Sequence, residues 1–263
     1  MSSKALSCTS PVDRGTFLDG LDFPPPLRAA LASGHRKRGP VVKICGLSTP
    51  ATLRAALGSG ADLVGFVFFA KSPRNVSLET AEKLAELTGT RAVKVALTVD
   101  ADDHTLAQIV ARAQPDMLQL HGHESPARVA QIRAQFGLPV IKAIGVSSAA
   151  DLKEVAAYSA VADRLLFDAK PPAGADLPGG NGLAFDWQLL RDLALPVPFM
   201  LSGGLDAENV AEAARQTGAA AVDVSSGVET APGRKDATKI TAFIAALRRA
   251  PGIERLGSEA RTV

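Results

Sequence analysis

Three residues that can carry out acid or base chemistry stand where short apolar runs end and the chain must turn. Cys45 closes the run VVKIC, His121 follows MLQL, and Asp168 follows RLLF. A thiolate can act as a base, and a carboxyl group whose pKa is raised by desolvation can act as an acid. If Cys45 and Asp168 face each other across a bound sugar, they can move protons without a metal or a cofactor.

Each of these residues also has a structural interpretation. Cys45 could be a small buried apolar residue, and Asp168 could form a salt bridge with Lys170 or Lys43. His121 could donate a hydrogen bond to a substrate or cap a loop. The two histidines of HGH have no matching carboxylate motif, so their spacing does not predict a metal site.

Two further segments are suited to binding an anion. LSGGLDAENV places Gly203 and Gly204 between an apolar run and a helix, and DVSSGVE places Ser225, Ser226 and Gly227 after the next apolar run. Glycine amides can approach an anion closely because no Cβ intervenes. The alternative is that these glycines only shape turns, but the two segments together favour a phosphate site.

Arg74 and Asp223 are candidates for contacts with the rest of a substrate. Arg74, in FFAKSPRNVS, could hold a carboxylate through a bidentate pair, although a solvated loop charge is the common alternative. Lys71 is a weaker candidate for the same role. Asp223 lies two residues before Ser225 and could meet a substrate hydroxyl or form a structural hydrogen bond.

Bringing these residues together requires a scaffold, and the sequence shows a regular alternation of strand and helix patterns. Short β-branched apolar runs predict strands, and Ala-rich stretches of helical period predict helices between them. Ser77 and Asp206 are suited to cap helix starts. The predicted strands are 41–47, 63–69, 92–99, 117–122, 139–146, 164–170, 199–205 and 221–228, and the predicted helices are 49–58, 77–88, 103–114, 125–136, 149–160, 186–193, 206–217 and 235–249.

Eight such βα units predict an α/β fold, a single-domain (β/α)8 barrel with an N-terminal extension. A doubly wound open sheet is the alternative, but no GxGxxG motif follows the first strand. In a barrel the carboxyl ends of the strands meet at one rim. The thiol, the histidine, the acid and both anion-binding segments would then lie together.

The chain divides into three parts by composition. Residues 1–40 mix Ser, Pro, Gly and charge without a sustained period, which predicts a poorly structured extension with one or two helical turns in LRAALAS. Residues 41–250 form the predicted barrel, and residues 251–263 a loose tail. The Gly/Pro-rich segment 177–187 could be a mobile flap over the site or a passive connector.

Charge and cysteine content narrow the possible partners. Among 263 residues, 29 Lys or Arg nearly balance 27 Asp or Glu, so no nucleic-acid partner is expected. The sequence contains no run of about 18 uncharged apolar residues, so no membrane span is predicted. Its N-terminus lacks the apolar block of a secretory signal. Cys8 lies in a polar segment, so a disulfide with Cys45 is not expected. We expect a reduced, cytoplasmic protein, as a monomer or a homodimer.

Seven motifs, in this order, resemble the phosphoribosylanthranilate isomerase family of tryptophan biosynthesis. They are KICGL, GFVFFAKSPRNVS, LQLHG, LLFDAK, PGGNGLAFDW, LSGGLDAENV and DVSSGVE with PGRKD, and they span about residues 41–249. The extension before KICGL is unusual for this family.

The resemblance implies a (β/α)8 barrel and a reaction without metal or cofactor. That reaction is the Amadori rearrangement of N-(5-phosphoribosyl)anthranilate to 1-(2-carboxyphenylamino)-1-deoxyribulose 5-phosphate. On this basis Cys45 is expected to be the general base, Asp168 the general acid, and Arg74 the partner of the anthranilate carboxylate. The SGG and SSG amides are expected to bind the phosphate.

Overall fold

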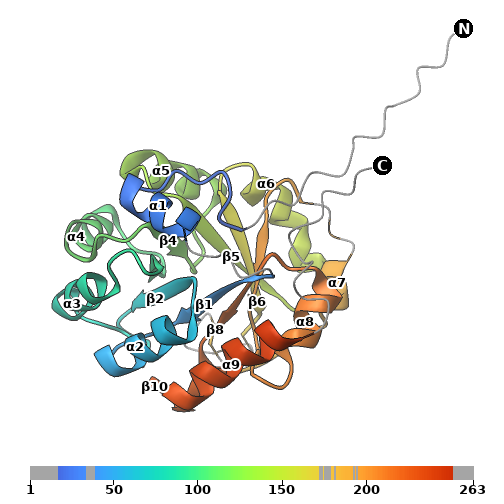
Figure 1. Cartoon of the computed structure of the whole chain (residues 1–263). Helices are drawn as coiled ribbons and strands as arrows, with labels where there is room; N and C mark the ends of the chain where they lie inside the picture. The colour runs from blue at the N-terminus through green and yellow to red at the C-terminus, as the bar shows by residue number, and fades with distance from the viewer. Residues whose placement is uncertain are drawn as a thin grey trace, which may run out of the picture.

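The computed structural model describes residues 17–33, 39–171, 174, 179–180, 182–191, 193 and 195–250. Eight parallel strands close into a barrel in chain order, with helices around them (Figure 1). Because β1 is hydrogen-bonded to both β2 and β8, the sheet has no free edge. The predicted (β/α)8 barrel is confirmed, and the open sheet is excluded. The strands are β1 (Val41–Cys45), β2 (Leu63–Phe68), β3 (Val93–Thr98), β4 (Met117–Leu120), β5 (Val140–Val146), β6 (Arg164–Ala169), β7 (Phe199–Leu201) and β8 (Ala221–Val224).

The strands read as apolar runs because both of their faces are covered. One face points into the barrel, and the other packs beneath the helices. Buried polar side chains on strands are therefore exceptions that call for an explanation. They include Lys43, Gln119, Lys142, Asp168 and Asp223.

Helices follow the strands and cover the outside of the barrel. They are α2 (Pro50–Ser59), α3 (Leu78–Thr88), α4 (Asp103–Ala113), α5 (Pro126–Phe136), the 3-10 helix η1 (Ala149–Glu154) with α6 (Val155–Ser159), α7 (Gln188–Arg191), α8 (Val210–Thr217) and α9 (Ala237–Arg249). Ser77 caps α3 as predicted, because its hydroxyl accepts a hydrogen bond from the Thr80 amide. The start of α8 is later than predicted, because Asp206 instead accepts bonds from two amides in a preceding turn. None of the described helices is long and apolar enough to cross a lipid bilayer.

The segment after β8 differs from the sequence prediction, which extended the eighth strand to residue 228. The strand ends at Val224, and a 3-10 turn, η2 (Ser226–Val228), leads into a short antiparallel hairpin. The hairpin consists of β9 (Glu229–Ala231) and β10 (Arg234–Lys235). Its turn contains Gly233 with φ 79°, a conformation that favours glycine.

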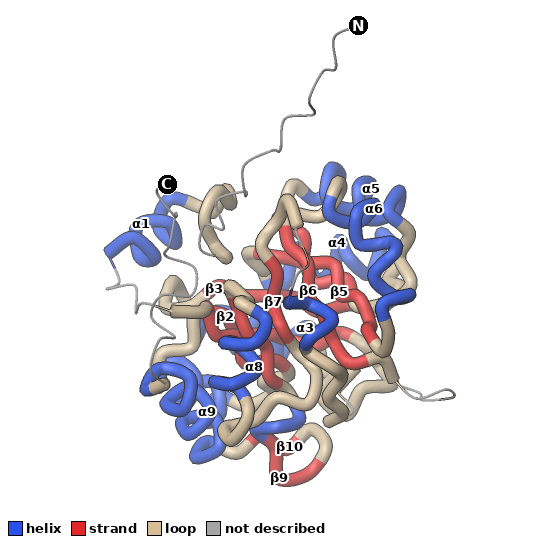
Figure 2. The backbone as a smooth tube through the Cα atoms, turned by 90° about the vertical axis from the view of Figure 1, so that its right-hand side faces the viewer, coloured by secondary structure: helices blue, strands red, loops and turns tan. Residues whose placement is uncertain are grey.

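Part of the N-terminal extension packs against the barrel. Phe17 and Phe23 are buried ahead of α1 (Pro25–Ser33), and Leu27 is buried within this helix. Their apolar cluster includes residues at or near the starts of strands, such as Leu63 and Met117, so this segment closes the end of the barrel opposite the strand carboxyl ends. Figure 2 shows α1 well separated from the β9–β10 hairpin.

The sequence of the extension did not reveal this packing, because its apolar residues are few and lack a sustained period. The Arg164 guanidinium, at the start of β6, donates to the carbonyls of Phe17 and Asp19. The predicted part boundaries at residues 40 and 250 stay predictions. Residues 1–16, 34–38 and 251–263 lie outside the described part of the chain.

Candidate active site

A pocket of about 730 Å³, part of it open to solvent, lies at the carboxyl ends of the strands. The pocket brings together residues from seven of the eight strands or the loops that follow them. Of the residues predicted from sequence, it is lined by Cys45, Arg74, His121, Asp168, Gly203, Gly204, Asp223, Ser225 and Ser226.

Cys45 ends β1 and has 3% of its surface exposed. Val67 and Leu97 pack with it, and Phe69 and Val99 extend this apolar side of the pocket. Burial raises the pKa of the Cys45 thiol, and the nearby Lys43 ammonium acts in the opposite direction. The structural interpretation of Cys45 therefore holds for its packing, but this residue also lines the pocket.

Asp223 of β8 lies beside Lys43 of β1. The Lys43 Nζ donates to the Asp223 Oδ1 at 2.9 Å, and both side chains are almost fully buried. The Ser202 hydroxyl lies 3.5 Å from the other carboxylate oxygen. Asp223 therefore has the structural partner that one alternative predicted. It also lines the pocket, and its contact with a substrate hydroxyl stays a prediction.

Asp168, near the end of β6, faces His121. The His121 Nε2 lies 3.3 Å from the Asp168 Oδ2, and the Ala169 amide donates to Oδ1 at 2.9 Å. The Gln119 Nε2 lies 3.1 Å from the His121 Nδ1. If this amide donates, the imidazole carries its hydrogen on Nε2, toward Asp168. The structural alternative for Asp168, a salt bridge with Lys170 or Lys43, is not observed. Lys170 pairs with Asp151 at 2.6 Å and Lys43 pairs with Asp223.

Arg74 lies in a buried cluster of charges that the sequence analysis missed. The Nε and Nη2 of Arg74 donate to the two carboxylate oxygens of Glu229 at 2.8 and 2.9 Å. The Lys235 Nζ shares Glu229 Oε1 at 2.7 Å and donates to the Ser225 hydroxyl and carbonyl. The cluster ties the loop after β2 to the loop after β8. In the sequence, the only sign of this cluster was the glutamate and the lysine of the motif VETAPGRKD.

Both cations affect the carboxylate between them. Burial acts to raise the pKa of Glu229, but the hydrogen bond from Arg74 and the charge of Lys235 outweigh it, so this pKa is lowered. Burial lowers the pKa of Lys235 to about 8, against the opposing effect of Glu229. Nη2 of Arg74 also donates to the Gly180 carbonyl at 3.2 Å. Within the described part of the chain no residue accepts a hydrogen bond from Nη1, which leaves this nitrogen for another partner.

The glycine and serine segments form one corner of the pocket. Gly203 has φ 87°, and a Cβ there would lie 2.6 Å from the Ala169 nitrogen. This position therefore requires glycine, and its backbone passes close to the site of Asp168. Gly227 does not line the pocket. A Cβ on Gly227 would lie 2.0 Å from the Leu205 carbonyl oxygen, so its role in the structure is close packing of the β7 and β8 loops.

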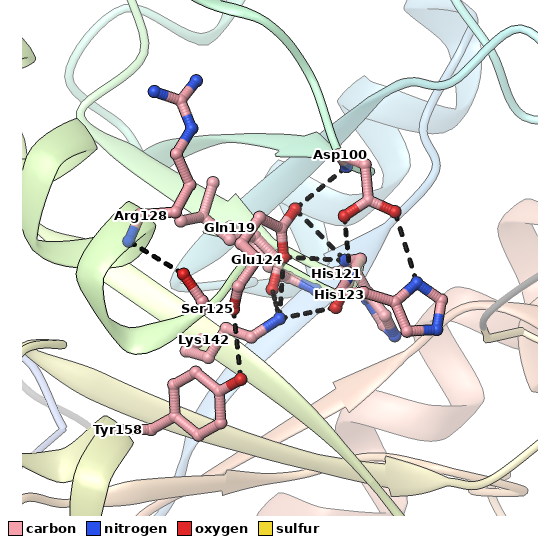
Figure 3. A network of polar contacts seen from close by, with 11 residues as sticks. Asp100, Gln119, His121, His123, Glu124, Ser125, Arg128, Lys142 and Tyr158 are labelled. Carbon is pink, nitrogen blue, oxygen red and sulfur yellow. Dashed lines mark hydrogen bonds and ion pairs between the residues drawn. The ribbon is translucent and has the colours of Figure 1, made fainter.

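A second buried ion pair, between Lys142 and Glu124, fixes the loop that carries His121 (Figure 3). The Lys142 Nζ donates to Glu124 Oε2 and to the Gly122 carbonyl, both at 2.7 Å. Glu124 in turn accepts hydrogen bonds from the amides of Gly122 and Asp100. The solvent-facing position predicted for His123 is correct, since its side chain is 94% exposed. Sequence reasoning missed the Lys142–Glu124 pair because the two residues lie in different βα units.

The segment 177–187 contributes to the pocket through Gly179, Gly180, Gly182 and Leu183. Residues 177, 178 and 181 lie outside the described part of the chain, so the choice between flap and connector stays a prediction. Among the described residues, no group of three His, Cys, Asp or Glu side chains is placed to hold a metal ion.

The fold and the rim together define a TIM-barrel protein with a pocket of polar and apolar side chains at the carboxyl ends of its strands, where enzymes of this class have their active sites. A family model for N-(5'-phosphoribosyl)anthranilate (PRA) isomerase matches residues 42–246. The chain belongs to this family, and it is an isomerase.

Sequence relatives support this assignment over almost their whole length. The N-(5'-phosphoribosyl)anthranilate isomerase of Rhodopseudomonas palustris (strain BisB18) is 66% identical over 208 residues, which cover 79% of this chain and 95% of the relative. The protein of the same name from Nitrobacter winogradskyi is 59% identical over 210 residues, covering 80% of this chain and 93% of the relative.

Solved structures agree. The phosphoribosyl anthranilate isomerase of Thermotoga maritima has a TM-score of 0.70 at 35% identity, covering 79% of this chain and 98% of that one. A phosphoribosyl anthranilate isomerase in complex with reduced 1-(o-carboxyphenylamino)-1-deoxyribulose 5-phosphate has a TM-score of 0.68 at 34% identity, covering 79% and 97%. The resemblance noted in the sequence motifs is confirmed.

Proposed function

We propose that this chain catalyses the Amadori rearrangement of N-(5-phosphoribosyl)anthranilate to 1-(2-carboxyphenylamino)-1-deoxyribulose 5-phosphate in L-tryptophan biosynthesis. The observation that carries the proposal is that Cys45 and Asp168, on β1 and β6, line one pocket. In the barrel β7 and β8 stand between these strands, so the thiol and the carboxyl group reach the pocket from different directions.

The pocket wall supports one orientation of the substrate. The phosphate binds at the corner formed by Gly203, Gly204, Ser225 and Ser226. The anthranilate ring lies against the apolar side formed by residues such as Val67 and Leu97. The ring carboxylate meets Arg74, whose Nη1 is not used by Glu229.

The proposed mechanism needs two proton transfers. Asp168, protonated, donates to the ribose ring oxygen, and the ring opens to a Schiff base. Cys45, as a thiolate, removes the proton from C2′, and the resulting enolamine tautomerises to the ketone. Asp168 gives one proton to the substrate and Cys45 takes one from it, so the overall reaction consumes no protons. His121 holds the Asp168 carboxyl group in place through their contact at 3.3 Å.

The test is to supply the anthranilate substrate and follow its fluorescence. We expect turnover by the parent protein. Removing either proton-transfer group, by Cys45→Ser or Asp168→Asn, is expected to lower kcat by about 10²- to 10⁴-fold. Binding of a phosphorylated product analogue should persist in both variants. Loss of binding together with turnover would show that these residues have structural roles instead.

Arg74 has a separate test. Arg74→Ala is expected to weaken substrate binding and raise KM, with a smaller effect on kcat, because the lost contact is made in the ground state as well as in the transition state. An unchanged KM in a folded variant would remove the proposed carboxylate contact.

Other expectations from the sequence stay proposals. They are a cytoplasmic location, the absence of a nucleic-acid partner, a reaction without cofactor, and a monomeric or homodimeric assembly. Asp223 is proposed to contact a substrate hydroxyl with the carboxylate edge that Lys43 does not hold.

A further inference from the structure

Lys43 lies two residues before Cys45 on β1, so both side chains leave the strand on the same face. Lys43 has no exposed surface and Cys45 has 3%. A buried ammonium group is costly unless it has a partner that needs its charge. The proposed mechanism so far gives Lys43 no task.

The two side chains share one small space. Gly65 of β2 is the register partner of Cys45. A Cβ on Gly65 would lie 3.0 Å from the Cys45 Sγ and 3.2 Å from the Lys43 Cε. The absence of a side chain at Gly65 therefore leaves room for the thiol and the lysine chain to lie next to each other.

The charges around the thiol determine how readily it ionises. Burial is the largest effect and disfavours the thiolate, as does the Asp223 carboxylate. Lys43 and, to a smaller extent, Lys235 favour it. Asp223 holds the Lys43 ammonium at 2.9 Å. Burial acts to lower the pKa of Lys43, but Asp223 and Cys45 outweigh it, so the pKa of Lys43 is raised and the group stays charged.

We propose that Lys43 is a positioning residue whose buried ammonium group, held by Asp223, stabilises the thiolate of Cys45 and so makes it a competent base. The inference rests on the proposed role of Cys45 as the general base. It concerns a property of the thiol, however, that can be measured without turnover.

The experiment titrates Cys45 in a Cys8→Ser background, where it is the only thiol. Thiolate absorbance at ~240 nm, where thiolates absorb and thiols do not, is followed against pH, and the rate of alkylation at Cys45 is followed in parallel. Lys43→Met is expected to raise the thiol pKa by at least about one unit, which reduces the thiolate roughly tenfold at a given pH below it. Lys43→Arg, which keeps the charge, is expected to restore most of the parental value.

Activity supplies a second readout. In Lys43→Met the rise of kcat with pH, which follows ionisation of the base, should move to higher pH by the same amount as the thiol titration. KM should change little. A loss of activity that is equal at every pH would instead indicate a structural role and would overturn the proposal.

The matched control is Lys142, another fully buried lysine on a barrel strand with a carboxylate partner. Lys142→Met should leave the Cys45 titration at its parental midpoint. If single substitutions prevent folding, Lys43→Met/Asp223→Asn and Lys142→Met/Glu124→Gln remove both charges of each pair. The first double variant should still raise the thiol pKa and the second should not.

A folded Lys43→Met protein whose thiol titrates like the parent overturns the inference, even if the parent is an active isomerase. A parent without isomerase activity whose thiol pKa still depends on Lys43 would overturn the proposed function instead.

Discussion

Buried cations at the rim of this barrel each meet a carboxylate. Lys43 pairs with Asp223, and Lys142 pairs with Glu124, while Arg74 and Lys235 share Glu229. Removing one partner of such a pair leaves an uncompensated charge in a poorly solvated place. The pairs therefore fix the positions of nearby groups, and single substitutions within them should alter function as well as stability.

At Glu229 the expected effect is on substrate binding. Glu229→Gln offers Arg74 one acceptor instead of two, so the guanidinium loses its fixed orientation. We expect KM to rise about tenfold, equivalent to about 1.4 kcal/mol, with a smaller change in kcat. Steady-state kinetics check this, with the exposed Glu79→Gln as control. A folded variant with parental KM would contradict the prediction.

At Lys235 the expected effect depends on pH. The pKa of Lys235 is about 8 in the folded protein, below the ordinary lysine value of 10.5 that applies in the unfolded chain. Between these values the unfolded chain binds more protons, so the contribution of Lys235 to stability increases as pH rises. From pH ~8 to ~10 the parent should gain up to about 2 kcal/mol in unfolding free energy relative to Lys235→Met.

Urea unfolding of the parent and of Lys235→Met at several pH values measures this gain. Lys83→Met, at an exposed position, serves as the control and should show no such trend relative to the parent. A constant difference between the parent and Lys235→Met would show that the lysine titrates outside this range.

At the scale of elements, loops carry the site and strands hold the loops in place. The turn after β4 shows this clearly. Its Gly122 donates its amide hydrogen to Glu124, and the Gly122 carbonyl accepts a hydrogen bond from Lys142 of β5, so the backbone next to His121 is fixed on both sides. A strand residue thus sets the position of a loop residue one βα unit earlier.

The Glu124–Lys142 pair gives a prediction at this scale. Glu124→Gln or Lys142→Met alone should cost about 3–5 kcal/mol of unfolding free energy, because the remaining charge stays buried without a partner. Glu124→Gln/Lys142→Met should cost clearly less than the sum of the two single variants. A double-mutant cycle in urea measures the coupling, and strictly additive costs would show that the two charges do not depend on each other.

At the scale of the whole molecule, the two ends of the barrel have different tasks. The strand carboxyl ends bear the pocket, whereas Phe17, Phe23 and Leu27 close the opposite end. About four-fifths of this chain aligns with its relatives, and this part covers more than nine-tenths of each relative's length. The matched region of the family model begins at residue 42, after this N-terminal segment.

The N-terminal segment should therefore contribute to stability and not to catalysis. Phe17→Ala removes a fully buried ring and is expected to cost about 3–5 kcal/mol, with kcat/KM unchanged at a temperature where the variant is folded. Thermal and urea unfolding measure the cost. Asp22→Ala, in an exposed ion pair of the same segment, is the control and should change little. A loss of kcat/KM in folded Phe17→Ala would link this end to the active site.

The sequence by itself determined the barrel, the order of its elements, and most of the residues that reach the rim. It could do so because strand and helix periodicities are local, and because eight βα units in succession place every strand end at one rim. Cys45, Asp168 and the Gly203–Gly204 pair were therefore predictable as neighbours, although their sequence positions are far apart.

Only the tertiary structure decided which charges pair. Lys43 meets Asp223 across 180 residues of sequence, and Arg74 meets Glu229 across 155. It also decided that Phe17 fills the barrel end and that a hairpin follows β8. These contacts depend on barrel register and on the paths of loops, which are set by packing among distant segments and leave no periodic pattern in the sequence.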